Sequence, residues 1–360
     1  MAVPAILNDT NFKELVREGS FMNTSFRVRL ATHADYDAVM KIDEDVAGGG
    51  DYLPSSYHDM MDNSRTHCFL AELDGEMIAF VCYWIDGFSN TMTTSTAGRV
   101  NPKYRHRGLY VHFTELVELE MKKLYPSLLF DWSVSIVSES VIKRFELADG
   151  RLIEKKLYVV GSMHHENIQA NKDLVNLPLK VHSPNSSELM DLLNNKEVLN
   201  YLYPQGVFIH ANRYKPFPAS QHFIHTVVVK EPVIISGKLE SHDLGLSTLN
   251  VDSCSMCVRL TICYDGTPDE RIIKAHILKA TETMATLCTP LIDELHSKNK
   301  STYEKECLEG QSDKPKIRLS VLFPSAVDPR SVWEFIRETY HCEQLDKPSL
   351  YFGLFEKPYK

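Results

Sequence analysis

The most informative stretch of this 360-residue sequence is Gly98-Arg99-Val100-Asn101-Pro102-Lys103-Tyr104-Arg105-His106-Arg107-Gly108-Leu109-Tyr110. The residues before it predict a strand that ends at Val100, and the apolar spacing after it predicts a helix that begins near Leu109. The loop between them is basic, and Gly108 permits close approach of the backbone to a ligand. Because free N–H groups and the positive dipole end of a helix start attract anions, we expect this loop to hold a diphosphate. The alternative is an ordinary basic loop with a glycine at the helix entry.

Strands and helices follow one another in a regular order on both sides of this loop. Asp74-Gly75 separates two apolar runs and Asp86-Gly87 turns the chain again, which predicts an antiparallel meander of three strands. Three glycines at residues 48–50 end the first helix. The predicted strands are residues 26–30, 68–73, 77–85, 91–100, 128–136 and 152–160, and the predicted helices are residues 34–46, 51–61, 109–124 and 138–148.

The second half of the chain repeats this order. Residues 161–187 lose periodicity and are rich in Asn, His, Pro and Ser, so we predict the connection between two domains there. Beyond it we predict helices at residues 188–199, 271–296 (with Pro290 as a possible break) and 328–340, and strands near residues 207–211, 226–239, 244–251, 256–264, 317–323 and 350–356. The repeated order indicates an internal duplication. The predicted domains are residues 20–160 and 188–360, joined by the linker 161–187.

Composition and charge exclude several classes of function. At ~150 residues per domain the length predicts two domains, and the net charge of −9 gives no basic field for nucleic acid or an anionic membrane. No apolar run approaches the ~18 residues of a membrane span, and the charges within the first 18 residues do not fit a signal peptide. We therefore expect a soluble, cytoplasmic protein.

The cysteines and histidines do not predict a metal site. The eight cysteines are widely scattered, which favours buried, reduced thiols over a disulfide framework. Cys254 and Cys257 form a CxxC without a second pair nearby, so we expect them to serve packing rather than zinc binding or redox chemistry. His164 and His165 lie in a polar stretch and are predicted to be surface residues.

The loop sequence resembles a known signature. Arg105-His106-Arg107-Gly108-Leu109-Tyr110 is similar to the (Arg or Gln)-x-x-Gly-x-(Gly or Ala) motif of the GNAT superfamily of acyl-CoA-dependent N-acyltransferases, although Tyr110 replaces the final small residue. Residues 49–54 (Gly-Gly-Asp-Tyr-Leu-Pro), followed by Tyr57-His58, resemble vertebrate members that acetylate free histidine. The resemblance covers roughly residues 26–160. It implies a GNAT-type α/β (α+β) fold, a mixed, largely antiparallel sheet flanked by helices, with a second, divergent GNAT-like half.

The resemblance also implies a reaction and a cofactor site. The reaction is transfer of an acetyl group from acetyl-CoA, without a metal, to the α-amino group of a small free amino acid, with histidine as the leading candidate. A splay between the predicted strands at residues 91–100 and 128–136 would admit the co-substrate. The residues implied to contact it are Gly98, Arg99, Val100, Arg105, His106, Arg107, Gly108, Leu109, Tyr110 and Ser138.

Acyl transfer needs a deprotonated amine, donors for the developing oxyanion, and a proton for the departing thiolate. Backbone N–H groups near Arg99 or Val100 are the expected oxyanion donors. The candidate bases are Glu44, Asp51, His58, Asp131 and Glu139, of which Asp131 and Glu139 are preferred. The family's usual acid, a Tyr on the helix after the fifth strand, falls near Phe145 or Glu146 here, so Tyr110, Tyr83 or a water would replace it. Asp51, Tyr52 and His58 are the expected acceptor-side residues.

The second half carries no equivalent of the anion-binding loop. Between its predicted strand and helix lies Asp265-Gly266-Thr267-Pro268-Asp269-Glu270, whose negative charge would repel a diphosphate. We therefore predict that this half does not bind CoA and packs on the catalytic half. Two alternative functions remain open from the sequence: acetylation of a peptide N-terminus or a polyamine, and noncatalytic binding of acyl-CoA.

Overall fold

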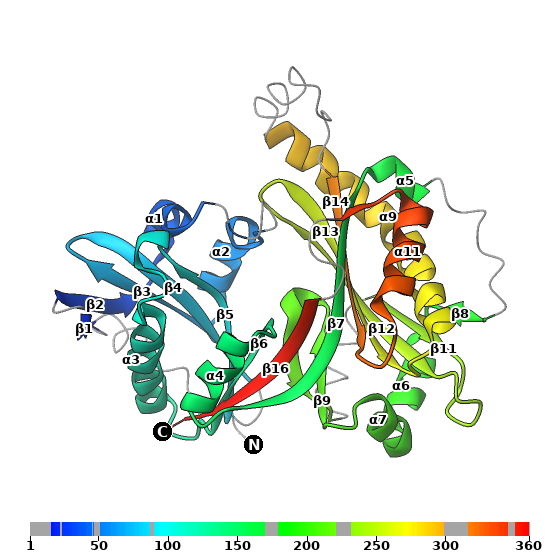
Figure 1. Cartoon of the computed structure of the whole chain (residues 1–360), viewed down its shortest axis with the longest axis horizontal. Helices are drawn as coiled ribbons and strands as arrows, with labels where there is room; N and C mark the ends of the chain where they lie inside the picture. Colours follow the sequence, from blue (N-terminus) through cyan, green and yellow to red (C-terminus); the bar gives the residue numbers. More distant parts are fainter. Residues whose placement is uncertain are drawn as a thin grey trace. The chain divides into compact units, whose positions relative to one another are not determined.

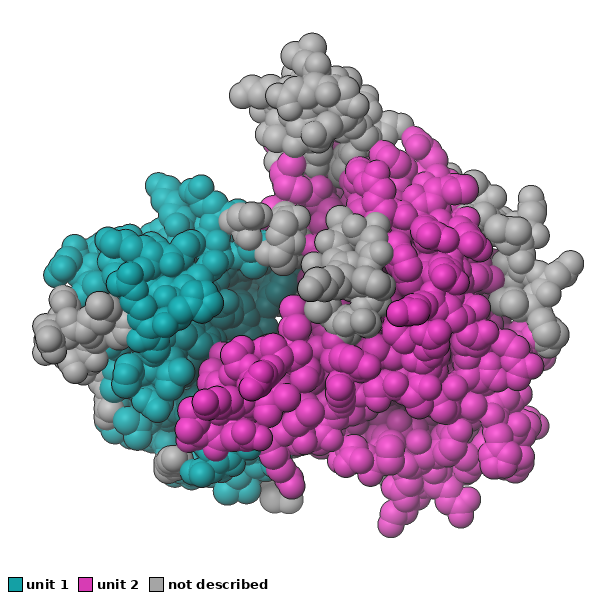
Figure 2. Space-filling view, in the orientation of Figure 1, with its two compact units in different colours: residues 1–133, 148–150, 356–360 teal, residues 134–147, 151–355 magenta. Residues whose placement is uncertain are grey.

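The computed structural model describes residues 16–21, 24–44, 46, 51–86, 90–169, 179–220, 232–298, 316–344 and 350–359. The chain divides into two compact units, which Figure 2 colours separately. Unit 1 comprises residues 1–133, 148–150 and 356–360, and unit 2 comprises residues 134–147 and 151–355. Each unit therefore takes in segments that are distant in sequence, and each is described by itself.

Unit 1 contains an antiparallel sheet extended by one parallel strand (Figure 1). Its strands are neighbours in the order β1 (Val16–Phe21), β2 (Thr24–Leu30), β3 (Thr66–Leu73), β4 (Glu76–Ile85), β5 (Met92–Val100) and β6 (Phe130–Ile136, which continues into unit 2). Asp74 and Gly75 both have positive φ, 50° and 83°, as a two-residue hairpin turn of type I′ requires. The predicted meander is thus confirmed, whereas β1 had no sequence prediction and the Gly87 turn lies outside the described residues.

Helices cover both faces of this sheet because its side chains alternate between them. One face packs the short helices η2 (His33–Asp35), α1 (Tyr36–Ile42) and α2 (Leu53–Asp62) through a core that includes Tyr57, Leu70 and Phe80. The other face packs α3 (Leu109–Leu124), which follows the turn η3 (Pro102–Tyr104), through Phe69 and Phe113. Both faces of β3 and β4 are therefore buried along most of their length, whereas β5 is buried at Met92–Thr94 and partly exposed from Ser95 to Gly98.

The strands of unit 2 also pair in a mixed arrangement. Its strands are neighbours in the order β16 (Leu350–Pro358, whose last residues belong to unit 1), β7 (Arg151–Met163), β14 (Lys316–Pro324), β13 (Cys257–Gly266), β12 (Gly245–Ser253), β11 (Val233–Ser236) and β8 (Val181–His182), with β15 (Glu343–Gln344) beside β7. The helices are α4 (Glu139–Leu147), α5 (His165–Gln169), α6 (Ser186–Asn194), α7 (Lys196–Leu202), α9 (Glu270–Lys298) and α11 (Pro329–Tyr340). A separate two-stranded sheet pairs β9 (Val207–His210) with β10 (Lys215–Pro218), on either side of the turn η4 (Asn212–Tyr214).

The order of elements in unit 1 recurs in unit 2. In unit 1, the antiparallel strands β3, β4 and β5 lead into α3 and then into the parallel strand β6. In unit 2, the antiparallel strands β11, β12 and β13 lead into α9 and then into the parallel strand β14. The predicted mixed, largely antiparallel sheet flanked by helices is confirmed, and so is the repeated order.

Several predicted boundaries in unit 2 were wrong. The strand predicted at residues 152–160 is longer, because β7 runs to Met163, and α5 follows it. The predicted helix 188–199 is two helices, since Asn195 ends α6 and its side chain accepts the N–H groups that start α7. Pro290 does not interrupt α9, which buries residues on both sides of it. The strand near residues 207–211 belongs to the separate sheet, and the described part of the predicted strand 226–239 is β11.

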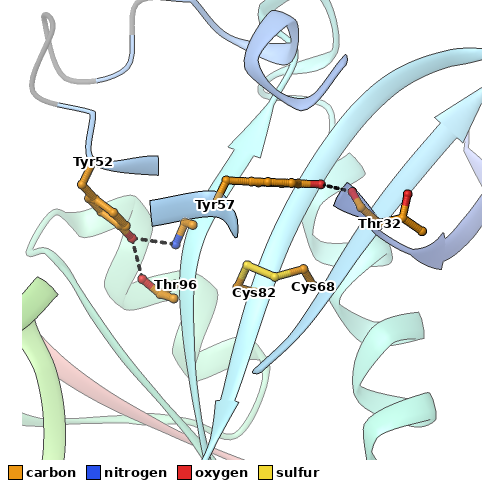
Figure 3. The surroundings of a disulfide bond; sticks show 7 residues. Thr32, Tyr52, Tyr57, Cys68, Cys82 and Thr96 are labelled. Carbon is orange, nitrogen blue, oxygen red and sulfur yellow. Dashed lines mark hydrogen bonds between the residues drawn. A yellow bond between two sulfur atoms is a disulfide. The ribbon is translucent and has the colours of Figure 1, made fainter. Parts of the chain in front are cut away.

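One prediction about the cysteines was also wrong. Cys68 and Cys82 are directly opposite each other on β3 and β4, and they form a disulfide with their Cα atoms 4.2 Å apart (Figure 3). Sequence separation does not reveal such a pair, because it depends on the register of the hairpin. Cys254, Cys257, Cys263, Cys288 and Cys342 are free thiols. Among the described residues no three metal-ligating side chains cluster, and no described helix is long and apolar enough to cross a membrane.

Candidate functional site

The site predicted from the sequence centres on the point where β5 loses its parallel neighbour. Residues Met92–Thr94 pair with Phe130–Trp132, and in the described chain the β5–β6 pairing ends there. On its other side, β5 stays paired with β4 as far as Val100. The last six residues of β5 thus have one edge that is not used in a strand ladder, as the predicted splay requires.

β5 carries a bulge on this part of its length. Thr96 pairs with Cys82 and Arg99 pairs with Phe80, so Ala97 and Gly98 together stand opposite a single residue of β4. Ala97 has a φ of 55°, in the left-handed region. The extra residue changes the alternation of side chains along the strand, so that Thr96 and Ala97 both face the α2 side of the sheet.

Tyr52 contacts the bulge from the α2 side (Figure 3). Its hydroxyl accepts the backbone N–H of Ala97 at 3.1 Å and shares a hydrogen bond with the Thr96 hydroxyl at 2.7 Å. The carbonyl of Tyr52 accepts the hydroxyls of Ser55 and Ser56 in the first turn of α2. These bonds fix Tyr52 both to its own helix and to the strand.

Asp51 and Arg99 hold the same turn in place by a buried ion pair. The Arg99 guanidinium donates to the Asp51 carboxylate, and only 3% and 11% of the two side chains are exposed. Asp51 also accepts the N–H of Leu53, the first residue of α2, at 3.0 Å. Arg99 further donates to the Asp43 carbonyl at 3.5 Å. The structure thus brings together Asp51, Tyr52 and Arg99, three of the predicted site residues.

Tyr110 contacts the bulge from the opposite side. A Cβ at Gly98 would overlap the Tyr110 hydroxyl and lie 3.0 Å from its Cζ atom. Gly98 is therefore required for Tyr110 to pack against the strand, alongside Phe113. Tyr110 is the residue that departs from the signature motif. It packs on Gly98, a strand residue that the resemblance implies contacts the co-substrate.

The loop from β5 to α3 exposes its basic side chains, and Gly108 begins the helix. Gly108 has a φ of 87°, which favours glycine, and it occupies the N-cap position of α3. Arg105 donates to the Val100 carbonyl at 3.0 Å and to the Asp43 carboxylate, so its guanidinium braces the loop. Lys103, His106 and Arg107 are exposed beside it. Together with the first-turn N–H groups, this arrangement suits an anion.

Asp131 lies on the α3 face at the point where β5 and β6 part. It is buried and accepts the hydroxyls of Thr93 at 2.6 Å and Ser95 at 2.8 Å. Burial, together with the charge of Glu118, raises the pKa of Asp131 to about 7. Glu118 itself pairs with Lys357 at 2.6 Å. Its surroundings thus bring the pKa of this candidate base close to neutrality.

The other candidates lie in different surroundings. The Nδ1 atom of His58 is 2.8 Å from that of His33 and the two rings stack, while His33 also contacts Asp62 at 2.9 Å. The Tyr83 hydroxyl is buried on the α3 face, 3.4 Å from Glu118. Glu44 is exposed beyond α1.

Ser138 and Glu139 belong to unit 2. The Ser138 hydroxyl accepts the N–H of Val141 at 3.3 Å in the first turn of α4, where Glu139 is exposed. Phe145, at the position expected for an acidic Tyr, stacks on Phe355 at 4.4 Å. At this position α4 therefore carries a phenyl ring that packs on Phe355, whereas the superfamily that the sequence resembles usually has a tyrosine hydroxyl there.

Sequence reasoning missed Thr96, Ala97 and Asp43. Thr96 and Ala97 lie within Thr-Thr-Ser-Thr-Ala-Gly at residues 93–98, an unusual run of small and polar residues for a central strand. That run is a signal for a bulge or a polar site, and it could have identified both residues. Asp43 had no such signal, because its partner Arg105 is 62 residues away.

Comparison with known proteins gives one consistent result. No family model matches the chain. Over 167 residues it is 24% identical to a histidine N-acetyltransferase of Xenopus tropicalis. The aligned region covers 46% of this chain and 50% of that protein. The chain resembles histidine N-acetyltransferases. A second such protein, from Oreochromis niloticus, is 32% identical over 99 residues, 27% of this chain and 28% of its own length. The chain thus matches half or less of the length of these relatives, and the predicted resemblance to N-acetyltransferases is confirmed.

Solved structures with low identity also align over most of the chain. A putative acetyltransferase from Pyrococcus horikoshii aligns with a TM-score of 0.47 and 12% identity, covering 96% of this chain and 92% of that one. A tandem GNAT protein from the clavulanic acid biosynthesis pathway aligns with a TM-score of 0.48 and 9% identity, covering 93% and 99%.

Proposed function

We propose that this protein is an acetyl-CoA-dependent N-acetyltransferase that acetylates the α-amino group of a free amino acid, with histidine as the first candidate. The observation that carries the proposal is the early end of the β5–β6 pairing, beside a bulged strand that leads directly to the glycine-started helix α3. Similarity to histidine N-acetyltransferases supports the choice of acceptor.

The co-substrate is proposed to bind along the unpaired edge of β5. Its diphosphate would lie at the start of α3, where Gly108 and the exposed Lys103, His106 and Arg107 favour negative charge. Arg105 would keep the loop in shape through Asp43 rather than point at a phosphate. The backbone from Gly98 to Val100 and the side chain of Tyr110 would contact the pantetheine arm.

The chemical roles are proposed from the surroundings of each side chain. Asp131 is the preferred base because a pKa near 7 matches proton transfer at neutral pH. Glu139 is the second candidate, and Tyr110 is the candidate acid for the thiolate. Both oxygens of Asp51 already accept hydrogen bonds, so we propose that Asp51 positions the turn that presents Tyr52 to the acceptor. His58 remains an acceptor-side candidate.

The second half is proposed to bind no CoA. Its strands β13 and β14 correspond in order to β5 and β6, but they pair over seven residues, Cys257–Cys263 with Lys316–Leu322. Only the last three residues of β13, Tyr264–Gly266, lie outside this ladder, compared with the last six of β5, and the loop before α9 is acidic. We keep the catalytic domain at residues 20–160, the linker at 161–187 and the divergent domain at 188–360 as part of this proposal.

A cytoplasmic location is also kept as a proposal. The Cys68–Cys82 disulfide argues against it, because stable disulfides are more typical of oxidising compartments. Fractionation of cells that produce the untagged protein, with the redox state of these two cysteines measured in each fraction, would decide between the two.

Release of free CoA from acetyl-CoA, with mass detection of products, tests the function across the twenty amino acids, several peptides and polyamines. Product with histidine alone supports the full proposal, and product with another amine keeps the reaction but changes the acceptor. Calorimetry should give one acetyl-CoA site per chain. The packing of Tyr110 on Gly98 favours a second candidate, a noncatalytic acyl-CoA-binding protein, which saturable binding without any product would support.

A further inference from the structure

We propose that the Ser95 hydroxyl carries a proton between the acceptor amine and the buried carboxylate of Asp131, which makes Ser95 a catalytic residue. The inference rests on the proposed function, because it places the reacting groups at the unpaired edge of β5. It also resolves a difficulty with Asp131 as the base. Asp131 is only 5% exposed, which leaves an amine little surface to contact directly.

Ser95 lies at the boundary between the covered and the unpaired part of β5. Thr94 is the last residue of β5 that pairs with β6, and Ser95 is the first residue beyond it. Thr93 and Thr94 are buried, whereas Ser95 is half-buried. Ser95 is therefore the residue through which a substrate at the unpaired edge can reach the covered part of the strand.

Two hydroxyls hold the Asp131 carboxylate, one on each oxygen. Thr93 donates to Oδ1 at 2.6 Å, and Ser95 donates to Oδ2 at 2.8 Å. The two donors are two residues apart on β5, so their side chains lie on the same face of the strand. Thr93 is fully buried, whereas Ser95 borders the unpaired edge. The oxygen bonded to Ser95 is thus the one with a short path to the proposed site.

On the Thr93 side, the hydrogen-bond chain leads to a phenol. The Thr93 proton is directed at Asp131, so the Tyr359 hydroxyl, 2.8 Å away, donates to the Thr93 oxygen when Asp131 is ionised. Burial, together with the charge of Asp131, raises the pKa of Tyr359 well above its ordinary value. Tyr359 therefore keeps its proton at neutral pH. This branch holds the carboxylate in place, and the Ser95 branch provides the path for the proton.

The charged groups around Asp131 poise it to accept a proton. Glu118 on α3 forms an ion pair with Lys357 at 2.6 Å, and Tyr83 on β4 donates to Glu118 at 3.4 Å. The lysine of this cluster thus pairs with Glu118 rather than with Asp131. Burial, and next the charge of Glu118, raise the pKa of Asp131 to about 7. Asp131 can therefore take up a proton and return it at neutral pH.

The chemical step balances with Asp131 as the temporary proton carrier. The acceptor ammonium gives one proton to the Ser95 oxygen while the Ser95 proton moves to Oδ2 of Asp131. The neutral nitrogen then attacks the thioester carbon, and the carbonyl electrons move to the oxygen. The carbonyl re-forms, the C–S bond breaks with its electrons on sulfur, and a second proton from the nitrogen neutralises the thiolate. Asp131 finally returns its proton to solvent through Ser95, so the products are the acetamide, free CoA and one proton.

Ser95→Ala and Thr93→Val form a matched pair of variants, because each removes one hydroxyl from the same carboxylate. Loss of either hydrogen bond should raise the pKa of Asp131. The infrared band of its protonated carboxyl group reports this in difference spectra against Asp131→Asn. Only Ser95→Ala should also remove the proton path. We expect it to lower kcat at neutral pH by roughly 10²- to 10⁴-fold, the range of general acid–base catalysis, whereas Thr93→Val should lower kcat above its new pKa by less than about tenfold.

The pH dependence distinguishes a proton path from a structural role. In the wild type, kcat/KM should rise with the ionisation of Asp131. In Ser95→Ala that rise near neutrality should disappear, and activity should instead grow at alkaline pH, where the amine loses its proton to solvent. Ser95→Thr keeps a hydroxyl at this position, so it should retain most of the activity and the pH profile of the wild type.

The possible outcomes separate this inference from the proposed function. If the wild type turns over and Ser95→Ala keeps its kcat or its pH profile, the relay is wrong and the proposed function stands. Equal losses of kcat in Ser95→Ala and Thr93→Val would contradict the relay in the same way. If the wild type forms no product with any amine, both are wrong, and the infrared titration still measures the hydrogen bond between Ser95 and Asp131.

Discussion

The carboxylate of Asp51 accepts the guanidinium of Arg99 in a nearly fully buried ion pair that joins the start of α2 to the end of β5. The two residues are 48 positions apart in the sequence. The pair connects a helix on one face of the sheet with the bulged strand that carries the proposed chemistry, so its integrity should matter for both stability and activity.

Removal of Asp51 should strongly destabilise the protein. Asp51→Ala leaves Arg99 buried without its partner, and we expect a loss of about 3–5 kcal/mol in the free energy of unfolding. Urea denaturation measures this loss, and the double variant Asp51→Ala/Arg99→Met should recover part of it. The exposed pair of Glu294 and Lys298 is the control, since Glu294→Ala should change stability by less than about 0.5 kcal/mol. Equal effects at the two pairs would contradict a special role for the buried one.

Gly98 should tolerate no larger side chain while Tyr110 is present. Gly98→Ala introduces a Cβ that overlaps the Tyr110 hydroxyl, so we expect a loss of about 1–3 kcal/mol, typical of overpacking, and weaker acetyl-CoA binding. Tyr110→Ala in the same chain should restore part of the stability because it removes the clashing ring. Thermal melts of both variants check this, and an additive double variant would rule out the steric explanation.

Stability should depend on pH through Asp131. Its pKa is raised from 3.8 to about 7 in the folded protein, so between these pH values the folded state keeps a proton that the unfolded state releases. Stability contributed by this group is therefore present at low pH and falls as the pH rises through the window. Asp131→Asn cannot titrate. The wild type should lose stability relative to this variant as the pH rises from about 4 to about 7, by at most about 1.4 kcal/mol per pH unit.

Chemical denaturation at each pH measures that difference. If the free energy of unfolding changes with pH in the same way in the wild type and in Asp131→Asn, then Asp131 ionises normally in the folded state.

Alkylation should distinguish Cys68 and Cys82 from the five free cysteines of the described residues. In denaturant without reductant, iodoacetamide should label those five thiols but not Cys68 or Cys82, and a reductant should then release both for labelling. Peptide mapping by mass spectrometry reads out each position. Because Cys82 is directly opposite Thr96 in the sheet, we also expect reduction to lower kcat more than the affinity for acetyl-CoA. Labelling of Cys68 before reduction would refute the disulfide.

Local patterns predicted much of the fold, and long-range pairings escaped prediction. The Asp74-Gly75 hairpin and the glycine start of α3 were predictable because turn chemistry acts over a few residues. Pro290 suggested a break in the helix because proline locally disfavours helical backbone. The packing of α9 on the sheet outweighs this local preference. The Asp51–Arg99 pair and the Cys68–Cys82 bond depend on strand register and helix placement, which no local signal encodes.

The candidate site was predicted in part for the same reason. The loop at residues 101–108 and Tyr52 were found from a contiguous motif. The bonds that join Tyr52 to Thr96 and Ala97 became visible only once the bulge placed two consecutive residues on one face of the sheet.

The discontinuous course of unit 1 has a consequence for its synthesis. Its last members are residues 356–360, among them Lys357, which pairs with Glu118 on α3, and Tyr359, whose hydroxyl meets that of Thr93 on β5 at 2.8 Å. A ribosome completes β1 to α3 more than 200 codons before it adds these residues. Unit 1 is therefore begun before unit 2 and completed only after residues 151–355 of unit 2 have been added, and a growing chain must keep the α3 side of this sheet available until residues 356–360 emerge.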